Sequence, residues 1–391
     1  MRVLKIVSSE WRNESRDKRE LSVCEELGME TAVLAKGNPG DRLRKDEVSG
    51  FQVYRESTRP LGTDPHLNPL NRVISLFTWA GQARKLAPDI ISGHDLIGLL
   101  IGWMSNVGHK KKAKLVYDSH EFELGRNSNR GKLATWCVGK LERFLMKRCA
   151  FSMMVNDSIA DEVQKIHRLK ERPVVVRNIA PYWELDPERT AAARKELLDS
   201  FSQLPENPFL IMHHGAVTTD RGIEEMIELV SRLPHIVAVI LGNPATIEYL
   251  DGLKRQCREK GVEGRMIFHP AVPVEILRHY VSAADLSVDA GSMRCVSYRF
   301  SLPNKFFESI QSETPLVFNQ YPDTTKIMEH YQLGIVANTS DPDTLETAVE
   351  RMRTDKKYYA ACKEHLKLAK KELCWENEKE VLKCAYRNIM A

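Results

Sequence analysis

The sequence predicts an α/β protein of two domains, each built on a parallel β-sheet covered by helices on both faces. Three observations support this class. Short β-rich runs alternate with amphipathic helical segments along most of the chain, as in βαβ units. The length, 391 residues, suffices for two or three domains. The charge also divides: residues 1–181 hold 31 Lys and Arg against 22 Asp and Glu, whereas the remainder holds 26 against 31.

The first half starts with an apolar run at residues 3–7, which we expect to be a strand. A helix is expected over residues 16–27, with Gly28 just past its end as a C-cap. The strand signal recurs at residues 31–34, 88–92, 114–117 and 152–155. Each run is followed by a polar turn and a helical pattern, so these strands are expected to pair in parallel.

A second series of strands begins after Asn178-Ile179-Ala180-Pro181, which places the domain boundary near residue 182. Strands are expected at residues 209–213, 237–241, 266–268, 286–288, 316–318 and 334–336. Helices are expected between them at residues 221–232, 245–259, 274–282 and 304–311. The prediction is therefore an N-terminal domain of residues 1–181, a C-terminal domain of residues 182–372, and a final helix over 373–391.

Composition excludes several classes of protein. Hydrophobic residues make up 42% and charged residues 28%, close to the average of globular proteins, which excludes a disordered chain. The longest nearly apolar run, residues 96–104, is about half of what a membrane span needs. Lys5 interrupts the apolar N-terminal run, which therefore predicts a strand and not a signal peptide. Eight cysteines without a CxxC spacing predict reduced core thiols in a cytoplasmic protein.

Ligands of open parallel sheets bind beyond the carboxyl ends of the strands, and two such sheets that face each other make a cleft. In the second half, a turn from Gly215 to Gly222 follows the strand at 209–213 and leads into a helix. Free N–H groups at the helix start and the guanidinium of Arg221 would suit a phosphate. The alternative is an ordinary turn with a surface arginine.

A second turn, Ser301-Leu302-Pro303-Asn304-Lys305-Phe306-Phe307-Glu308, carries more information. Pro303 suits a helix start, where a cation such as Lys305 opposes the helix dipole unless an anion binds there. Glu308, one turn deeper, could accept two hydrogen bonds from a ribose diol. The alternative is a surface ion pair between Lys305 and Glu308.

Three further turns hold candidate residues. The rigid turn at His269, with two prolines, could present backbone groups to a base, although a structural role is as well supported. In the first half, His120 follows the strand at 114–117, where a neutral imidazole could bind a sugar hydroxyl or act as an acid or base. His94 and Asp95 could contact a hydroxylated acceptor. His120 could instead be a capped turn residue, and Asp95 a helix cap.

Four features, taken in order along the chain, resemble the retaining glycosyltransferases of the GT-B fold, in group 1 or family 4. They are the segment YDSHE at 117–121, the GxxxxxRG turn, SLPNKFFE at 301–308 and a final helix with Trp375. The resemblance covers nearly the whole chain. It implies two Rossmann-like domains that face each other across a cleft. The C-terminal domain would bind a nucleotide-sugar, the N-terminal domain an acceptor, and the helix over 373–391 would cross back to the N-terminal domain.

The resemblance also implies roles for individual residues. Arg221 and Lys305 would neutralise the leaving diphosphate, and His120 would contact the transferred sugar, so these three are the implied catalytic residues. Glu308 would bind the ribose. The implied nucleotide-sugar site comprises Gly215, Arg221, His269, Asn304, Lys305 and Glu308. His94 and Asp95 would bind the acceptor. No metal or cofactor is implied, because cationic side chains take over the stabilisation of the leaving group.

The implied reaction moves a hexose or N-acetylhexosamine from a UDP- or GDP-linked donor to a hydroxyl, with retention of the anomeric configuration. Cell-surface polysaccharide, glycolipid or a glycosylated metabolite would be the product. Phe300 stands where relatives carry the first of two glutamates, and Ala216 where an arginine often stands. These departures leave the identity of the sugar open. A nucleotide-sugar epimerase on the same fold and a catalytically inactive partner subunit are the alternatives.

Residues 132–147 predict a helix with a basic face. Lys132, Trp136, Lys140, Arg143 and Lys147 recur on one stripe, and Leu133, Cys137, Leu141, Phe144 and Leu145 on another, which we expect in the core. A basic face around a tryptophan is typical of a helix on anionic lipid, although a solvated helix is the alternative. Membrane contact would make the enzyme peripheral to the cytoplasmic leaflet and its acceptor lipid-linked. No nucleic-acid partner is expected.

Overall fold

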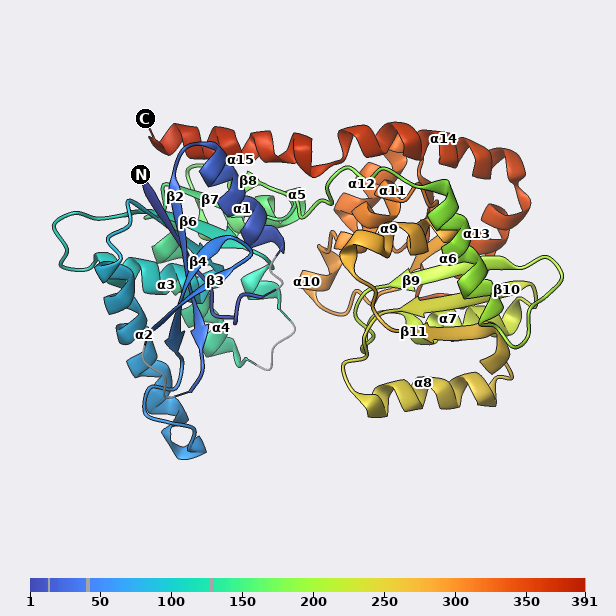
Figure 1. Ribbon diagram of the computed structural model, residues 1–391, viewed down its shortest axis with the longest axis horizontal. Helices are drawn as coiled ribbons and strands as arrows, with labels where there is room; N and C mark the ends of the chain where they lie inside the picture. The colour runs from blue at the N-terminus through green and yellow to red at the C-terminus, as the bar shows by residue number, and fades with distance from the viewer. Residues whose placement is uncertain (13–14, 40–42, 127–129, 391) are drawn as a thin grey trace. The chain divides into compact units, whose positions relative to one another are not determined.

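The computed structural model describes residues 1–12, 15–39, 43–126 and 130–390. The chain divides into two compact units. Unit 1 comprises Met1–Arg177 together with Lys379–Ala391, and unit 2 comprises Asn178–Glu378. Each unit contains its own β-sheet with helices on both faces (Figure 1). The predicted fold class, α/β with two Rossmann-like domains, is therefore confirmed.

The sheet of unit 1 has eight strands. They are β1 (Arg2–Ile6), β2 (Glu30–Gly37), β3 (Arg44–Val48), β4 (Phe51–Ser57), β5 (Ile90–His94), β6 (Lys114–Ser119), β7 (Phe151–Met154) and β8 (Val174–Val175). Their order is β3-β4-β2-β1-β5-β6-β7-β8, and every neighbouring pair is parallel except β3 with β4. The carboxyl ends of β1, β5 and β6 therefore lie side by side at one edge of the sheet.

The helices of unit 1 pack on this sheet. They are α1 (Ser15–Glu26), α2 (Asn68–Lys85), α3 (Asp95–Asn106), α4 (Lys132–Met146) and α5 (Asp157–His167), with short 3-10 turns η1 (Pro65–Leu67) and η2 (Glu123–Gly125). The start of α5 is set by Asn156, whose side chain accepts a hydrogen bond from the N–H of Ile159 at 2.9 Å. The β3–β4 hairpin and α2 had no counterpart among the sequence-predicted elements. β3 is a charged edge strand and therefore shows no apolar run in the sequence.

Unit 2 has a six-stranded, fully parallel sheet. Its strands are β9 (Phe209–His214), β10 (Ile236–Leu241), β11 (Met266–His269), β12 (Leu286–Asp289), β13 (Leu316–Phe318) and β14 (Gly334–Val336). They follow the order β11-β10-β9-β12-β13-β14. All six were predicted from the sequence to within one residue at each end. β9 and β10 are buried along their whole length, and a strand buried on both faces reads as a continuous apolar run.

Ten helices, counted over the described residues, belong wholly or partly to unit 2. They are α6 (Pro187–Asp199), α7 (Ile223–Arg232), α8 (Ile247–Glu259), α9 (Val274–Ala283), α10 (Val296–Arg299), α11 (Asn304–Gln311), α12 (Pro322–Tyr331), α13 (Pro342–Thr354), α14 (Lys356–Glu372) and the start of α15 (Trp375–Met390), beside a 3-10 turn η3 (Glu263–Arg265). Successive residues of β9 pack into different hydrophobic clusters, Leu210 on one face and Ile211 on the other. Both faces of the sheet are therefore covered.

Most of α15 belongs to unit 1, where it packs beside α1 (Figure 1). Its fully buried Tyr386 donates a hydrogen bond to Glu20 at 2.5 Å. On the surface, Lys379 and Lys383 pair with Glu26 at 3.0 and 2.7 Å. The contact between these helices therefore combines a buried hydroxyl–carboxylate bond with two partly exposed ion pairs.

The expectation for the apolar stripe of α4 was largely wrong. Leu133, Cys137 and Phe144 are exposed, and only Leu145 of that stripe is fully buried. The physical reason is a buried polar contact: α4 turns Glu142 toward the sheet, where it binds Tyr117 at 2.9 Å and His167 at 2.9 Å.

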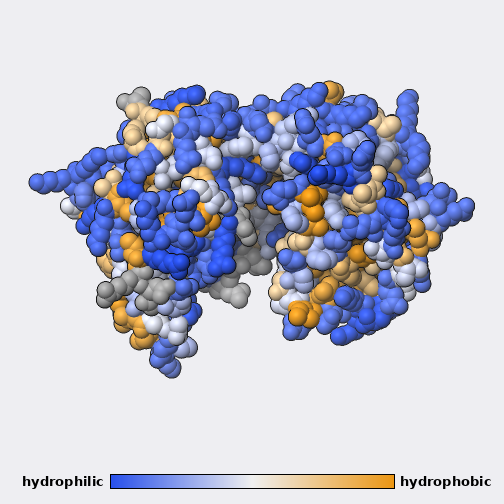
Figure 2. Space-filling view, in the orientation of Figure 1, coloured by the Kyte–Doolittle hydropathy of each residue, from blue (hydrophilic) through white to orange (hydrophobic). Residues whose placement is uncertain are grey.

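Figure 2 also shows hydrophobic side chains on the surface at one end of α2.

Two further features bear on the classes of protein that the amino-acid composition excluded. None of the helices in the described part of the chain combines the length and the apolar character that a bilayer span requires. All eight cysteines are free thiols, and only four of them, Cys24, Cys257, Cys362 and Cys374, are buried.

Gly222 gives a direct test of how tightly unit 2 is packed at the start of α7. Its φ is +78°, and a Cβ placed there would lie 2.2 Å from the carbonyl carbon of Ala290. We expect Gly222→Ala to lower the free energy of unfolding by about 2–4 kcal/mol, through backbone strain and a clash with Ala290, the residue after β12. Urea unfolding measures this loss.

The matched control is Gly252→Ala, inside α8 with open space around the new methyl group. This change should raise stability by about 0.5–1 kcal/mol, because alanine is the better helix former. Equal stability of the two variants would contradict the packing described here.

Candidate functional site

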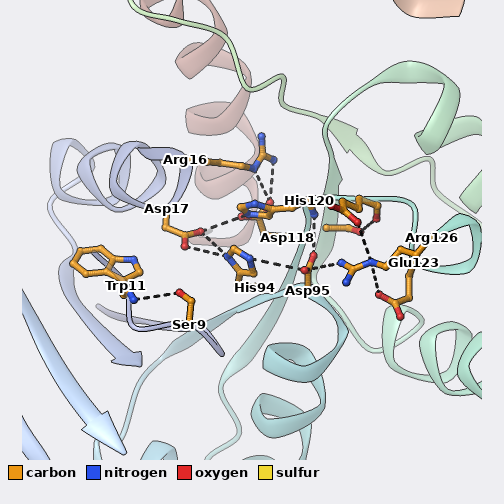
Figure 3. Close-up of polar contacts among 12 residues, drawn as sticks. Ser9, Trp11, Arg16, Asp17, His94, Asp95, Asp118, His120, Glu123 and Arg126 are labelled. Atoms are coloured by element: carbon orange, nitrogen blue, oxygen red, sulfur yellow. Dashed lines mark hydrogen bonds and ion pairs between the residues drawn. The ribbon is translucent and has the colours of Figure 1, made fainter. Parts of the chain in front are cut away.

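The carboxyl edge of the unit 1 sheet brings three sequence-predicted residues together (Figure 3). β5 ends at His94, Asp95 starts α3, and His120 directly follows β6. The imidazole rings of His94 and His120 lie against each other, with centroids 3.8 Å apart and planes inclined by 35°. The candidate acceptor residues and the candidate catalytic histidine thus form one cluster.

Asp95 ties this cluster to the segment that follows His120. Its carboxylate accepts a hydrogen bond from the backbone N–H of His120 at 3.0 Å and one from Arg126 at 2.7 Å. Its backbone has a φ of +55°, a conformation that aspartate tolerates better than most residues. Both carboxylate oxygens are therefore engaged with residues outside α3.

Two buried carboxylates hold the imidazoles. His94 Nδ1 lies 3.0 Å from Asp17 on α1, and His120 Nε2 lies 3.0 Å from Asp118 on β6. Asp17 also approaches His120 Nε2, at 3.6 Å. Asp17 was missed by the sequence reasoning, because nothing in its local pattern points to β5 or β6. Each imidazole is therefore oriented by a carboxylate partner.

Two buried cations balance these carboxylates. Lys5 Nζ, on β1, lies 3.1 Å from Asp17, 2.7 Å from Asp118 and 2.5 Å from Glu20. Arg16 pairs with Asp118 at 2.9 Å. Three carboxylates thus face two cations, which leaves one negative charge. Because an uncompensated buried charge is costly, a protonated imidazole fits this balance.

The pKa values agree with that balance. Burial disfavours a charged imidazole, but the negative charge of Asp118 and hydrogen bonds to Asp118 and Asp17 outweigh it and raise the pKa of His120 to about 9. Burial would raise the pKa of Asp118, yet Arg16 and Lys5 hold it well below its ordinary value. His120 is therefore an imidazolium at neutral pH, where the sequence suggested a neutral ring.

The same side chains have the spacing of a metal site. Ligand atoms of Asp17, His94 and His120 lie within 4.8 Å of one another. A divalent cation there would lie close to the Lys5 ammonium, which is 3.1 Å from Asp17. The charge of this cluster is therefore better balanced by a proton on His120 than by a bound divalent cation.

The second candidate region is the carboxyl edge of the unit 2 sheet. β9 ends at His214, and the turn from Gly215 to Gly222 leads into α7. Gly215 has a φ of +122°, which favours glycine. The guanidinium of Arg221 lies 5.7 Å from the ring centroid of Tyr298. Within the described residues Arg221 pairs with no carboxylate, so its charge is available.

Lys305 occupies the first turn of α11, as expected, and its carboxylate partner is Asp289 instead of Glu308, the partner in the alternative interpretation. Its ammonium lies 3.0 Å from Asp289 at the end of β12, and burial lowers its pKa although Asp289 opposes this. Glu308 contacts His214 Nε2 instead, at 3.1 Å. The alternative of a surface ion pair between Lys305 and Glu308 is thus wrong. Asp289 and His214, missed from the sequence, are the last residues of β12 and β9.

The two remaining predicted residues are His269 and Asn304. His269 ends β11 at the edge of the sheet, where Nδ1 lies 2.7 Å from the carbonyl of Pro270 and Nε2 lies 3.6 Å from Glu196. Asn304 is exposed at the first position of α11. Contacts among the described residues join Lys305 to Asp289 and Glu308 to His214, but join neither pair to His269.

Comparison with protein-family models relates part of unit 2 to one family. Residues 194–368 match the family model Glycosyl transferases group 1. An uncharacterized glycosyltransferase of Methanocaldococcus jannaschii, MJ1607, is 24% identical over 343 residues, which span 84% of this chain and 81% of that protein. The match to the family model covers Gly215, Arg221, His269, Asn304, Lys305 and Glu308.

Solved structures resemble the whole chain. The crystal structure of Anabaena Alr3699/HepE in complex with UDP has a TM-score of 0.77 at 13% identity, over 100% of both chains. The same protein in complex with UDP-glucose has a TM-score of 0.76 at 14% identity, over 100% of this chain and 99% of that one. At such low identity the likeness concerns the fold. This chain therefore has the fold of the GT-B glycosyltransferases, and its residues 194–368 match the model of the glycosyl transferases group 1 family.

Proposed function

We propose that this protein is a retaining glycosyltransferase that moves a hexose or N-acetylhexosamine from a nucleotide-sugar to a hydroxyl group of an acceptor. The observation that carries the proposal is the pair of cations, Arg221 and Lys305, before α7 and at the start of α11 in the group 1 domain. The donor would bind to unit 2 and the acceptor to unit 1.

The diphosphate of the donor accounts for the charge at the edge of unit 2. Lys305 is nearly buried and has one carboxylate partner, Asp289, whereas Arg221 pairs with none among the described residues. The helix starts beside them add unpaired N–H groups and partial positive charge. A diphosphate would thus find two cations and two helix dipoles. No metal is needed in this scheme, because these groups stabilise the leaving diphosphate.

Glu308 would bind the ribose of the donor. Its contact with His214 holds the carboxylate in place while leaving it 22% exposed, so that a diol could still approach. The Anabaena HepE structures contain UDP and UDP-glucose, which supports a uridine nucleotide as the first donor to test. Gly215 would let the turn before Arg221 approach the phosphates closely.

His120 would act on the transferred sugar as a charged hydrogen-bond donor. An imidazolium cannot accept a proton, but it can donate to a sugar hydroxyl or to an oxygen that gains negative charge in the transition state. His94 and Asp95 would contact the acceptor from the same edge. Retention would follow from attack of the acceptor on the same face from which the diphosphate leaves. We place this activity in the cytoplasm, in the synthesis of surface polysaccharide, glycolipid or a glycosylated metabolite.

Nucleotide binding tests the donor half of the proposal. In a thermal-shift screen of UDP, GDP, ADP and TDP sugars, one nucleotide class should raise the melting temperature, because it binds only the native state. Lys305→Ala should weaken this nucleotide by about 10- to 100-fold, through loss of a charged hydrogen bond, and abolish transfer.

Two variants control this experiment. Lys254→Ala removes an exposed lysine from α8 and should bind the nucleotide like the wild type. Lys305→Arg keeps the charge and should retain part of the affinity. A folded Lys305→Ala variant with full turnover would rule out the proposed role of Lys305.

The charge of His120 gives a prediction for pH. Since its pKa is raised to about 9, the imidazolium is present at neutral pH and is lost as the pH rises through 9. The turnover number should therefore fall above pH 9, while donor affinity changes less. His120→Ala should lower turnover by about 100-fold at pH 7, with a smaller effect on donor affinity. A pH profile of His120→Ala with the same alkaline fall as the wild type would contradict this assignment.

A further inference from the structure

The exposed face of α4 carries an apolar stripe. Leu133, Trp136 and Phe144 are 75%, 60% and 38% exposed, and they recur at helical spacing together with the exposed Cys137. Trp136 and Leu133 lie in the first two turns of the helix. Large apolar side chains in such an arrangement indicate a surface that something covers.

All exposed charges of α4 are positive. Its one acidic residue, Glu142, is buried against His167 and Tyr117. The basic residues of the helix are Lys132, Lys140, Arg143 and Lys147, counting its C-cap. In the described part of the chain, Lys132, Lys140 and Arg143 have no carboxylate partner, and Lys140 Nζ instead lies 5.3 Å from the ring centroid of Trp136. The stripe is therefore flanked by unneutralised cations.

A groove of about 500 Å³ runs beside these cations. Leu124, Gly139 and Ile166 contribute its apolar surface, and basic groups contribute much of the rest. Of its basic groups, Arg130 is already paired with Glu123, at 2.7 Å. An anionic headgroup with a hydrocarbon tail matches this combination of free cations and apolar surface.

A neighbouring helix adds to the apolar surface. Leu70, Val73 and Phe77 of α2 are exposed and lie three and four residues apart, on one stripe. Since α3 packs against both α2 and α4, the two stripes belong to one helical layer. Figure 2 shows hydrophobic side chains gathered over the end of α2.

We propose that α4 docks unit 1 onto an anionic lipid bilayer, with Leu133, Trp136 and Phe144 in the interface and a lipid phosphate in the groove. Apolar insertion and attraction to anionic headgroups act together on such a helix. The cationic face argues against a second copy of this chain as the partner, because a two-fold contact would bring like charges together.

Docking on a bilayer would also restrict the acceptor of the proposed transfer reaction. This consequence rests on the proposed function. α4 begins at the carboxyl edge of the sheet, after the segment that starts at His120 and is tied to Asp95 through Arg126. The first turns of α4 therefore lie at the same edge of unit 1 as His94 and His120. A lipid-linked acceptor held in the bilayer would reach this edge along the docked face.

Vesicle flotation tests the proposal with the full chain. The wild type should float with vesicles that contain about 30% phosphatidylglycerol in phosphatidylcholine, and not with phosphatidylcholine alone. Raising the salt from about 0.15 M to about 0.5 M should release it, because screening weakens the electrostatic part. Lys132→Glu/Lys140→Glu and Leu133→Ala/Trp136→Ala should each reduce the bound fraction more than about tenfold.

Matched controls lie on α8 of unit 2, where Ile247 is 70% exposed and Lys254 is also exposed. Ile247→Ala and Lys254→Glu should float like the wild type. Nucleotide thermal shifts of all variants should equal that of the wild type, which separates failure of docking from failure of the proposed donor site. The proposal is overturned if the wild type does not float, or if the α4 variants float equally well. It is also overturned if light scattering finds a dimer that the Leu133→Ala/Trp136→Ala variant dissociates.

Discussion

The ammonium of Lys5, inside the sheet of unit 1, sets the geometry of the whole carboxyl edge. It touches Asp17, Glu20 and Asp118 within 3.1 Å, and through two of them it fixes both histidines. Each carboxylate comes from a different place: the first turn of α1, the middle of α1 and the end of β6. A buried ammonium needs these partners, so the three segments are held at mutual distances that the backbone alone would not impose.

Unit 2 handles charge in the opposite way. In unit 1 the buried charges are nearly neutralised within the protein, with His120 supplying the last positive charge. In unit 2 Lys305 has a single partner, and Arg221 has none among the described residues. Burial lowers the pKa of Lys305, which means that the folded protein bears a cost for its charge. A ligand with negative charge would remove that cost. The contrast supports a neutral or hydroxylated ligand at the carboxyl edge of the unit 1 sheet and an anionic one at the carboxyl edge of the unit 2 sheet.

The sequence allowed much of this fold to be predicted, for a physical reason. Strands that are buried on both faces, such as β9 and β10, appear as continuous apolar runs. The end of β9 marks the turn that holds Arg221, and the end of β6 in unit 1 marks the position of His120. Side-chain partners depend on tertiary contacts and were not predictable. The pairing of Lys305 with Asp289 requires β12 to lie beside α11, and Asp17 reaches His94 across 77 residues. The apolar stripe of α4 was wrongly predicted to lie in the core, because the helix is rotated so that Glu142 is buried. The residues next to Glu142 in the sequence do not indicate that its side chain is buried.

The contact between Tyr386 and Glu20 links two segments 366 residues apart in the chain. During synthesis α1 leaves the ribosome early, whereas α15 follows only after all of unit 2 has been made. Until then Glu20 lacks the hydrogen bond from the Tyr386 hydroxyl, and the side of α1 that α15 covers stays exposed to solvent. The unit that is translated first is thus completed last, and folding of the growing chain cannot proceed strictly from one unit to the next.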